Sequence, residues 1–115
     1  MWAKYPQPFA DRSRFTDPKT TKPAIVNVYR ATGYGLLPSM GTTIDAVIRR
    51  GVRFAVCQMA TRATAGVIAR STGGNADDIY KELAEHLIPN AHLVPAGIVA
   101  VNRAQERGYS LATVS

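Results

Sequence analysis

The chain has 115 residues, of which 46% are hydrophobic and 19% are charged, so it is long enough for one hydrophobic core and too short for two domains. It contains no run near the roughly 20 apolar residues that a membrane span needs, and its first residues lack the apolar stretch of a secretion signal, so we expect a soluble cytoplasmic protein without a membrane partner. Its one cysteine, Cys57, excludes an internal disulfide.

The net charge of +6 attracts anions, nucleic acid or acidic proteins before any specific contact forms. Most of this excess lies in residues 1–35, which hold six basic and two acidic side chains. The remainder of the chain is nearly balanced, and no predicted helix carries a basic stripe.

Residues 1–23 have four prolines, scattered aromatics and no helical or strand period, which predicts an irregular basic and aromatic arm in front of one α/β domain over residues 24–115. Basic residues interleaved with Trp2, Tyr5, Phe9 and Phe15 are typical of a surface that stacks single-stranded nucleic acid, and equally of an arm that docks on protein. With so few aromatics, we expect packing against this or a neighbouring subunit rather than nucleic-acid binding.

The first half of the domain begins with a β-rich run at residues 24–29, which predicts a strand, and a loop at Gly33 and Gly35. Thr42 and Asp45 have the spacing of a capping box, so a helix is predicted over residues 44–50, with Gly51 at its end. Residues 52–56 are compact and mostly apolar and predict a buried strand that ends at Cys57.

The second half continues to alternate helices and strands. We predict a helix at 58–72 closed by glycines, a helix between Asn75 and Pro89, a strand at 92–95, a helix at 97–107 and a last strand at 109–114. Strands alternating with helices over short loops predict a small doubly wound, mostly parallel sheet with helices on both faces.

Cys57 is the candidate reactive residue. In such a sheet, reactive groups gather beyond the carboxyl ends of the strands, where the N-terminus of a helix favours a thiolate. Arg62, one turn along the helix, would bind or tune the thiolate by lowering its pKa further. A thiolate attacks sulfur and carbon electrophiles, so this position suits sulfur transfer. Alternatively, Cys57 is a small hydrophobic residue of the core, because free cysteine is often buried.

Two stretches, VRFAVCQMATR and HLVPAGIVAVNRAQERGY, resemble the DsrE-like family of small sulfur-relay proteins, and the resemblance covers about residues 43–112. It implies a doubly wound parallel sheet, assembly into homo-oligomers, and a persulfide carried on Cys57 between a sulfur donor and an acceptor protein, with no organic cofactor or metal. Family members begin with a full strand-helix unit, whereas an irregular arm and one weak strand precede Thr42 here, so we expect a sheet that is short by one element. The alternative function is a non-catalytic assembly module of the same fold with Cys57 in its core.

Other chemistry-bearing residues have simpler explanations. His86 and His92 fit no metal-ligand spacing. Acidic side chains between residues 77 and 85 resemble paired catalytic carboxylates, but acids in a first helical turn and an Asp77–Lys81 pair stabilise ordinary helices. The glycine pairs form no nucleotide-binding motif. We therefore expect neither metal nor nucleotide.

Overall fold

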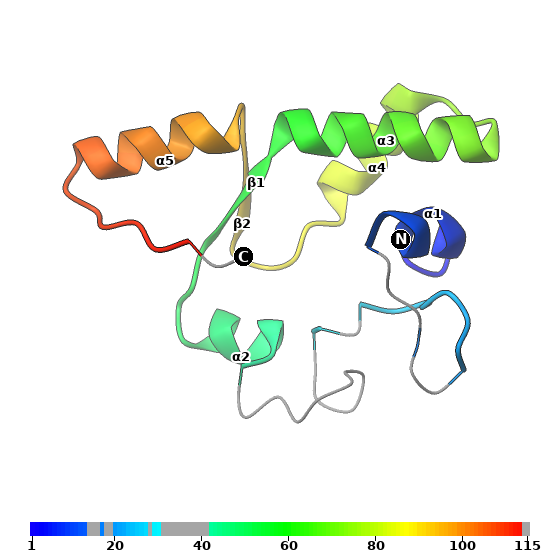
Figure 1. The fold of residues 1–115 in the computed structure, drawn as a ribbon, viewed down its shortest axis with the longest axis horizontal. Coiled ribbons are helices and arrows are strands. Elements are labelled where there is room, and N and C mark those ends of the chain that lie inside the picture. Colours follow the sequence, from blue (N-terminus) through cyan, green and yellow to red (C-terminus); the bar gives the residue numbers. More distant parts are fainter. Residues whose placement is uncertain (14–16, 18–19, 28, 31–41, 114–115) are drawn as a thin grey trace.

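The computed structural model describes residues 1–13, 17, 20–27, 29–30 and 42–113. Its elements in chain order are α1 (Pro6–Ser13), α2 (Ile44–Arg49), β1 (Phe54–Cys57), α3 (Gln58–Thr72), α4 (Ala76–Glu85), β2 (Ala91–Val94) and α5 (Gly97–Glu106). In Figure 1 the two strands cross the middle of the molecule, with α3 and α4 on one side and α5 on the other. The protein is thus a mixed α/β fold.

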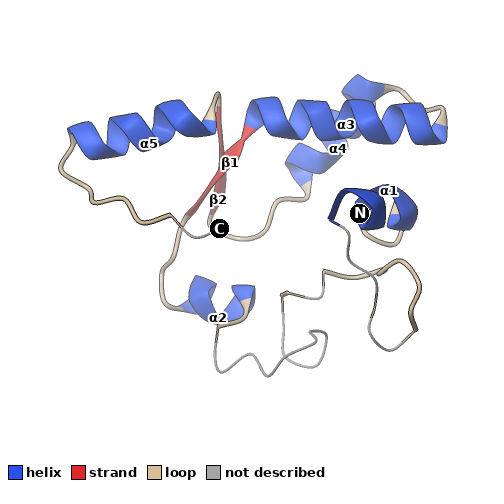
Figure 2. Ribbon diagram, viewed as in Figure 1, coloured by secondary structure: helices blue, strands red, loops and turns tan. Residues whose placement is uncertain are grey.

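The strands β1 and β2 pair in parallel, with Phe54 opposite Ala91 and Cys57 opposite Val94. The helices α3 and α4 form the connection between them, as a parallel pair requires. Just before β2, Asn90 adopts a φ of 61°, and its carbonyl oxygen accepts a hydrogen bond of 2.9 Å from the N–H of Phe54. The turn before β2 is therefore hydrogen-bonded to the first residue of β1. The carboxyl ends of the two strands lie at the same edge (Figure 2).

Local capping signals set the ends of the central helices, as predicted. The Asn75 side chain accepts hydrogen bonds from the N–H groups of Asp77 at 2.9 Å and Asp78 at 3.1 Å, so it caps α4. Gly73, with a φ of 71°, ends α3 in the left-handed conformation that glycine adopts without strain. The helix α2 is capped by Thr43, whose Oγ1 accepts from Ala46, and not by the predicted Thr42 and Asp45 pair.

The expectation of a wholly irregular arm over residues 1–23 is wrong, because Pro6–Ser13 form the helix α1. Its two prolines, Pro6 and Pro8, stand in the first turn, where a backbone N–H has no partner within the helix, so a missing N–H costs nothing there. The prolines that suggested irregular structure are therefore compatible with a helix start.

The sheet is smaller than predicted. Residues 24–27, 29 and 109–113, which belong to the two expected outer strands, have no strand structure, and positions 28 and 114 lie outside the described residues. Within the described part of the chain, the sheet consists of β1 and β2. The sheet face that carries Ala55 and His92 is exposed. We expected helices on both faces of the sheet, and among the described residues no helix covers this face. The coarse α/β class is confirmed, and the larger doubly wound sheet is not observed there.

The core lies between α3, α4 and the start of the chain. Tyr5, Ala65, Ile68 and Ile79 are buried together, and Ile68 is only 1% exposed. By contrast, no residue of α5, which is described in full, is buried. Large apolar side chains are exposed outside this core, among them Ile98 at 70% and Val99 at 51%. In the described residues, no helix is long and apolar enough to cross a membrane.

Candidate functional site

Cys57 is both the last residue of β1 and the N-cap of α3, with φ −70° and ψ 115°. Opposite it in the sheet is Val94, and β2 leads through a short turn into α5, which starts at Gly97. Figure 1 shows α3 and α5 starting at the same end of the strands and running in opposite directions. A Cβ atom built on Gly97 would lie 3.6 Å from the Cβ of Cys57, so the thiol stands where two helices begin.

The electrostatic setting of Cys57 favours its ionised form. The backbone N–H of Ala60 in α3, followed by the N–H of Gly97 in α5, lowers the pKa of the Cys57 thiol below its ordinary value of 9.0. Partial burial raises this pKa by a smaller amount, and the N–H of Met59 lowers it slightly. N–H groups in a first helical turn have no partner within the helix, which leaves them available to an anion.

Cys57 also lies in the wall of a cavity of about 850 Å³, which we call the arm cavity. One side is built from the start of the chain, with Trp2 and Phe9, and another from residues 25–27. The opposite wall comes from β1, from the first turns of α3 and from the end of α4 with the segment that follows it. The half-buried thiol is therefore placed at a recess and is not enclosed among core side chains.

Arg62 has partners on α4. Its guanidinium carbon lies 4.1 Å from the centroid of the Tyr80 ring, and its Nη1 is 3.6 Å from Oδ1 of Asp77. The pKa of Cys57 is shifted by backbone N–H groups and by partial burial. The additional lowering of this pKa that the sequence suggested for Arg62 thus comes from the N–H of Gly97 in α5. A role of Arg62 in tuning the thiolate stays a prediction, for which these contacts offer no support.

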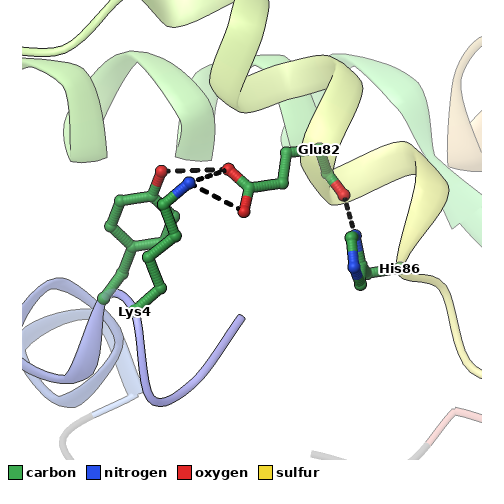
Figure 3. A network of polar contacts seen from close by, with 4 residues as sticks. Lys4, Glu82 and His86 are labelled. Carbon is green, nitrogen blue, oxygen red and sulfur yellow. Dashed lines mark hydrogen bonds and ion pairs between the residues drawn. The ribbon is translucent and has the colours of Figure 1, made fainter.

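The remaining candidate residues lie on α4, at its C-cap or on β2. Asp77 and Asp78 belong to the capped first turn of α4. His92 is exposed on β2, and the Nδ1 of His86 donates to the Glu82 carbonyl oxygen at 2.7 Å. Glu82 binds Lys4 at 2.8 Å and accepts from the Tyr5 hydroxyl at 3.1 Å, as Figure 3 shows for its labelled members.

Sequence reasoning missed two contributors to this site. One is Gly97, whose position could have been inferred from the sequence. If the strand after α4 pairs in parallel with β1, the helix that follows that strand must start at the same sheet edge as Cys57. The other is the arm, whose contact with α4 through Lys4 and Glu82 joins residues 78 positions apart. No local pattern indicates such a distant pair.

The fold and the site together define a small α/β protein with a half-buried thiol where two helices begin. Comparison of the chain with protein-family models, with curated proteins and with solved structures found no match.

Proposed function

We propose that this protein is a DsrE-like sulfur carrier that accepts sulfane sulfur as a persulfide on Cys57 and passes it to an acceptor protein. The observation that carries the proposal is the position of Cys57, half-buried at the starts of α3 and α5, with N–H groups from both helices lowering its pKa. A larger thiolate fraction at neutral pH is what a sulfur-accepting nucleophile needs.

The chemistry needs one thiol and no cofactor. The Cys57 thiolate attacks the outer sulfur of a donor persulfide, the S–S bond of the donor breaks, and the donor leaves as a thiolate. An acceptor thiolate then attacks the outer sulfur of the Cys57 persulfide, and Cys57 leaves as a thiolate in turn. The same N–H groups that stabilise the Cys57 thiolate before the first step stabilise it as leaving group in the second.

The proposal includes assembly into a homo-oligomer with the larger sheet of the DsrE-like family. Exposed Ile98 and Val99 on α5, and the exposed strand face at Ala55 and His92, support an assembly in which other protein covers this surface. The first strand-helix unit of the family has no counterpart among the described residues, so part of the covering surface would come from a neighbouring subunit.

The test is persulfide formation on the purified protein. After exposure to a persulfide donor and removal of excess reagent, intact mass should increase by one sulfur atom in the wild type and remain unchanged in Cys57→Ser. The bound sulfur should move to an added acceptor thiol. Equal persulfide labelling of wild type and Cys57→Ser would overturn the proposal.

A second candidate is a non-catalytic assembly module, which the exposed apolar surface of α5 favours. Thiol titration of the native protein separates the two functions. Rapid alkylation of folded Cys57 with an apparent pKa below its ordinary value supports the carrier, whereas reaction only after unfolding supports the module.

A further inference from the structure

The arm cavity has the size and lining of a small-molecule site. Its volume of about 850 Å³ lies within the range of ligand pockets, roughly 300–1,000 Å³. Trp2 and Phe9 stack in its wall, with ring centroids 5.0 Å apart. Ile25, Val26 and Leu87 add aliphatic surface from other parts of the chain. An apolar recess of this size gains free energy when an organic group displaces its water.

The guanidinium in the cavity wall is already engaged by a carboxylate. Arg30, the guanidinium of the cavity wall, is paired with Asp45 of α2, and its Nε lies 3.0 Å from the carboxylate oxygen. A thiosulfate or polysulfide ion would have to compete with this carboxylate for the guanidinium. The apolar part of the wall and the thiol remain available, which indicates a ligand with an apolar body and a sulfur atom.

We propose that the arm cavity binds the hydrocarbon group of a small apolar organic persulfide and presents its outer sulfur to Cys57. This inference rests on the proposed carrier function and specifies its donor. The Cys57 thiolate attacks the outer sulfur of R–S–S–H, the S–S bond breaks, and the new persulfide retains the hydrogen. The alkanethiolate R–S⁻ leaves and takes a proton from water, so no oxidant or reductant takes part.

Binding can be measured without the chemistry, because Trp2 is the one tryptophan of the sequence and lies in the cavity wall. Full-length Cys57→Ser is titrated with butanethiol, hexanethiol and octanethiol while Trp2 fluorescence is recorded. We expect saturable changes and an affinity that rises about fourfold for each added methylene, the value for burying one methylene from water. An affinity independent of chain length would overturn the site.

A pair of valine variants locates the binding. Val26 lines the cavity and is 37% exposed, while Val52, before β1, is outside its wall and is 40% exposed. In the Cys57→Ser background, Val26→Asp should weaken octanethiol binding by at least tenfold, because it places a charge against the hydrocarbon chain. Val52→Asp makes the same chemical change at equal exposure and should leave binding unchanged. Equal effects of the two variants would contradict the assignment.

Sulfur transfer distinguishes failure of this inference from failure of the carrier function. Wild type is given octyl persulfide or the polar glutathione persulfide at equal concentration, and persulfide on Cys57 is followed by intact mass. Faster labelling by octyl persulfide, slowed by Val26→Asp, supports the apolar donor. Equal rates from both donors would refute the apolar donor and leave the carrier standing. Length-dependent thiol binding without labelling by either donor would refute the carrier and the donor assignment, leaving only an apolar binding site.

Discussion

At the scale of single residues, the pKa of the Cys57 thiol depends on two helices, α3 and α5. The strand β1 alone places the thiol at the N-terminus of α3, but the parallel partner β2 adds the start of α5. N–H groups from both helices lower the pKa of the thiol. Reactivity of Cys57 should therefore depend on α5, although Cys57 and Gly97 are 40 positions apart along the chain.

Removing the N–H of Gly97 tests this dependence. Gly97 is the first residue of α5, a position that accepts proline, and Ala96 before it is extended, with φ −146° and ψ 133°, as a residue before proline prefers. In Gly97→Pro the pKa of Cys57 should rise, because one stabilising N–H is lost. The measurement is the pH dependence of the iodoacetamide alkylation rate, which should shift to higher pH.

Gly97→Ala is the matched control, since it keeps the N–H and adds a Cβ at ordinary contact distance, 3.6 Å from the Cβ of Cys57. Its alkylation profile should follow the wild type. If the two variants have the same profile, α5 contributes nothing to the ionisation of Cys57, and the account of the site must be restricted to α3.

At the scale of elements, the buried core lies where α3 packs against α4 and the start of the chain. Ile68 is 1% exposed and packs with Ala65, Ile79 and Tyr5. Ile68→Ala should lower the free energy of unfolding by about 2–5 kcal/mol, whereas Ile68→Val should cost about 0.5–1.5 kcal/mol. Urea unfolding followed by circular dichroism measures both. Equal small losses would show that the core does not depend on this contact.

The cap of α4 is a second element-scale prediction. The Oδ1 of Asn75 accepts hydrogen bonds from two backbone N–H groups at the start of α4. Asn75→Ala should lower the free energy of unfolding by about 1 kcal/mol, while Asn75→Asp, which keeps an acceptor oxygen, should have little effect. The two variants are compared by urea unfolding, and a similar loss in both would argue that the side-chain oxygen is not what stabilises the helix start.

The elements that sequence reasoning predicted are those with local signals. Asn75, Gly73 and the apolar spacing of α3 and α4 act within a few residues, so the ends of these helices follow from the sequence. The predicted strands at 24–29 and 109–114 had β-forming composition, but their described residues form no strand. A strand exists only with a partner strand, which composition does not supply. The same distinction applies to Cys57. Its place at the end of a strand was predictable from local sequence, whereas the contribution of Gly97 could be predicted only with knowledge that β1 pairs with β2.

At the scale of the whole molecule, the start of the chain is tied to α4 by Glu82. The ion pair with Lys4, followed by the hydrogen bond from Tyr5, lowers the pKa of Glu82 below its ordinary value, against an opposing effect of partial burial. A lowered carboxyl pKa in the folded state stabilises the protein above the ordinary pKa, near 4.5, and this stability is lost as the pH falls through the lowered pKa.

Glu82→Gln should remove that pH-dependent contribution. The wild type should be more stable than Glu82→Gln at pH 7, and the difference should shrink as the pH is lowered through the acid range. Urea unfolding at a series of pH values measures it. Glu85→Gln is the matched control, because Glu85 is an exposed glutamate on the same helix. The same pH-dependent loss in Glu85→Gln would contradict a specific role of the link to Lys4.

Assembly is the other prediction at this scale, and it follows from the proposed homo-oligomer. Sedimentation of the wild type should give a mass above that of the 12.4 kDa chain. Val99→Asp, at a half-exposed apolar position of α5, should shift the distribution toward the monomer, because a charge would be buried in the interface. Asn102→Asp adds the same charge at an exposed polar position of α5 and should have a smaller effect. A monomeric wild type would refute the assembly.

The pairing of β1 with β2 across the α3–α4 connection also determines the order in which the chain can acquire its structure. Phe54 and Ala91 are 37 positions apart, and closing so long a loop costs entropy that only the intervening helices can reduce. The helical hairpin should therefore form first, with the strands joining it afterwards. In pulse-labelled hydrogen exchange during refolding, amides around Ile68 should gain protection before that of Phe54, whose N–H bonds to Asn90. The lowered pKa of Cys57 would then be established only in the last step of folding, when the start of α5 comes to lie beside the thiol.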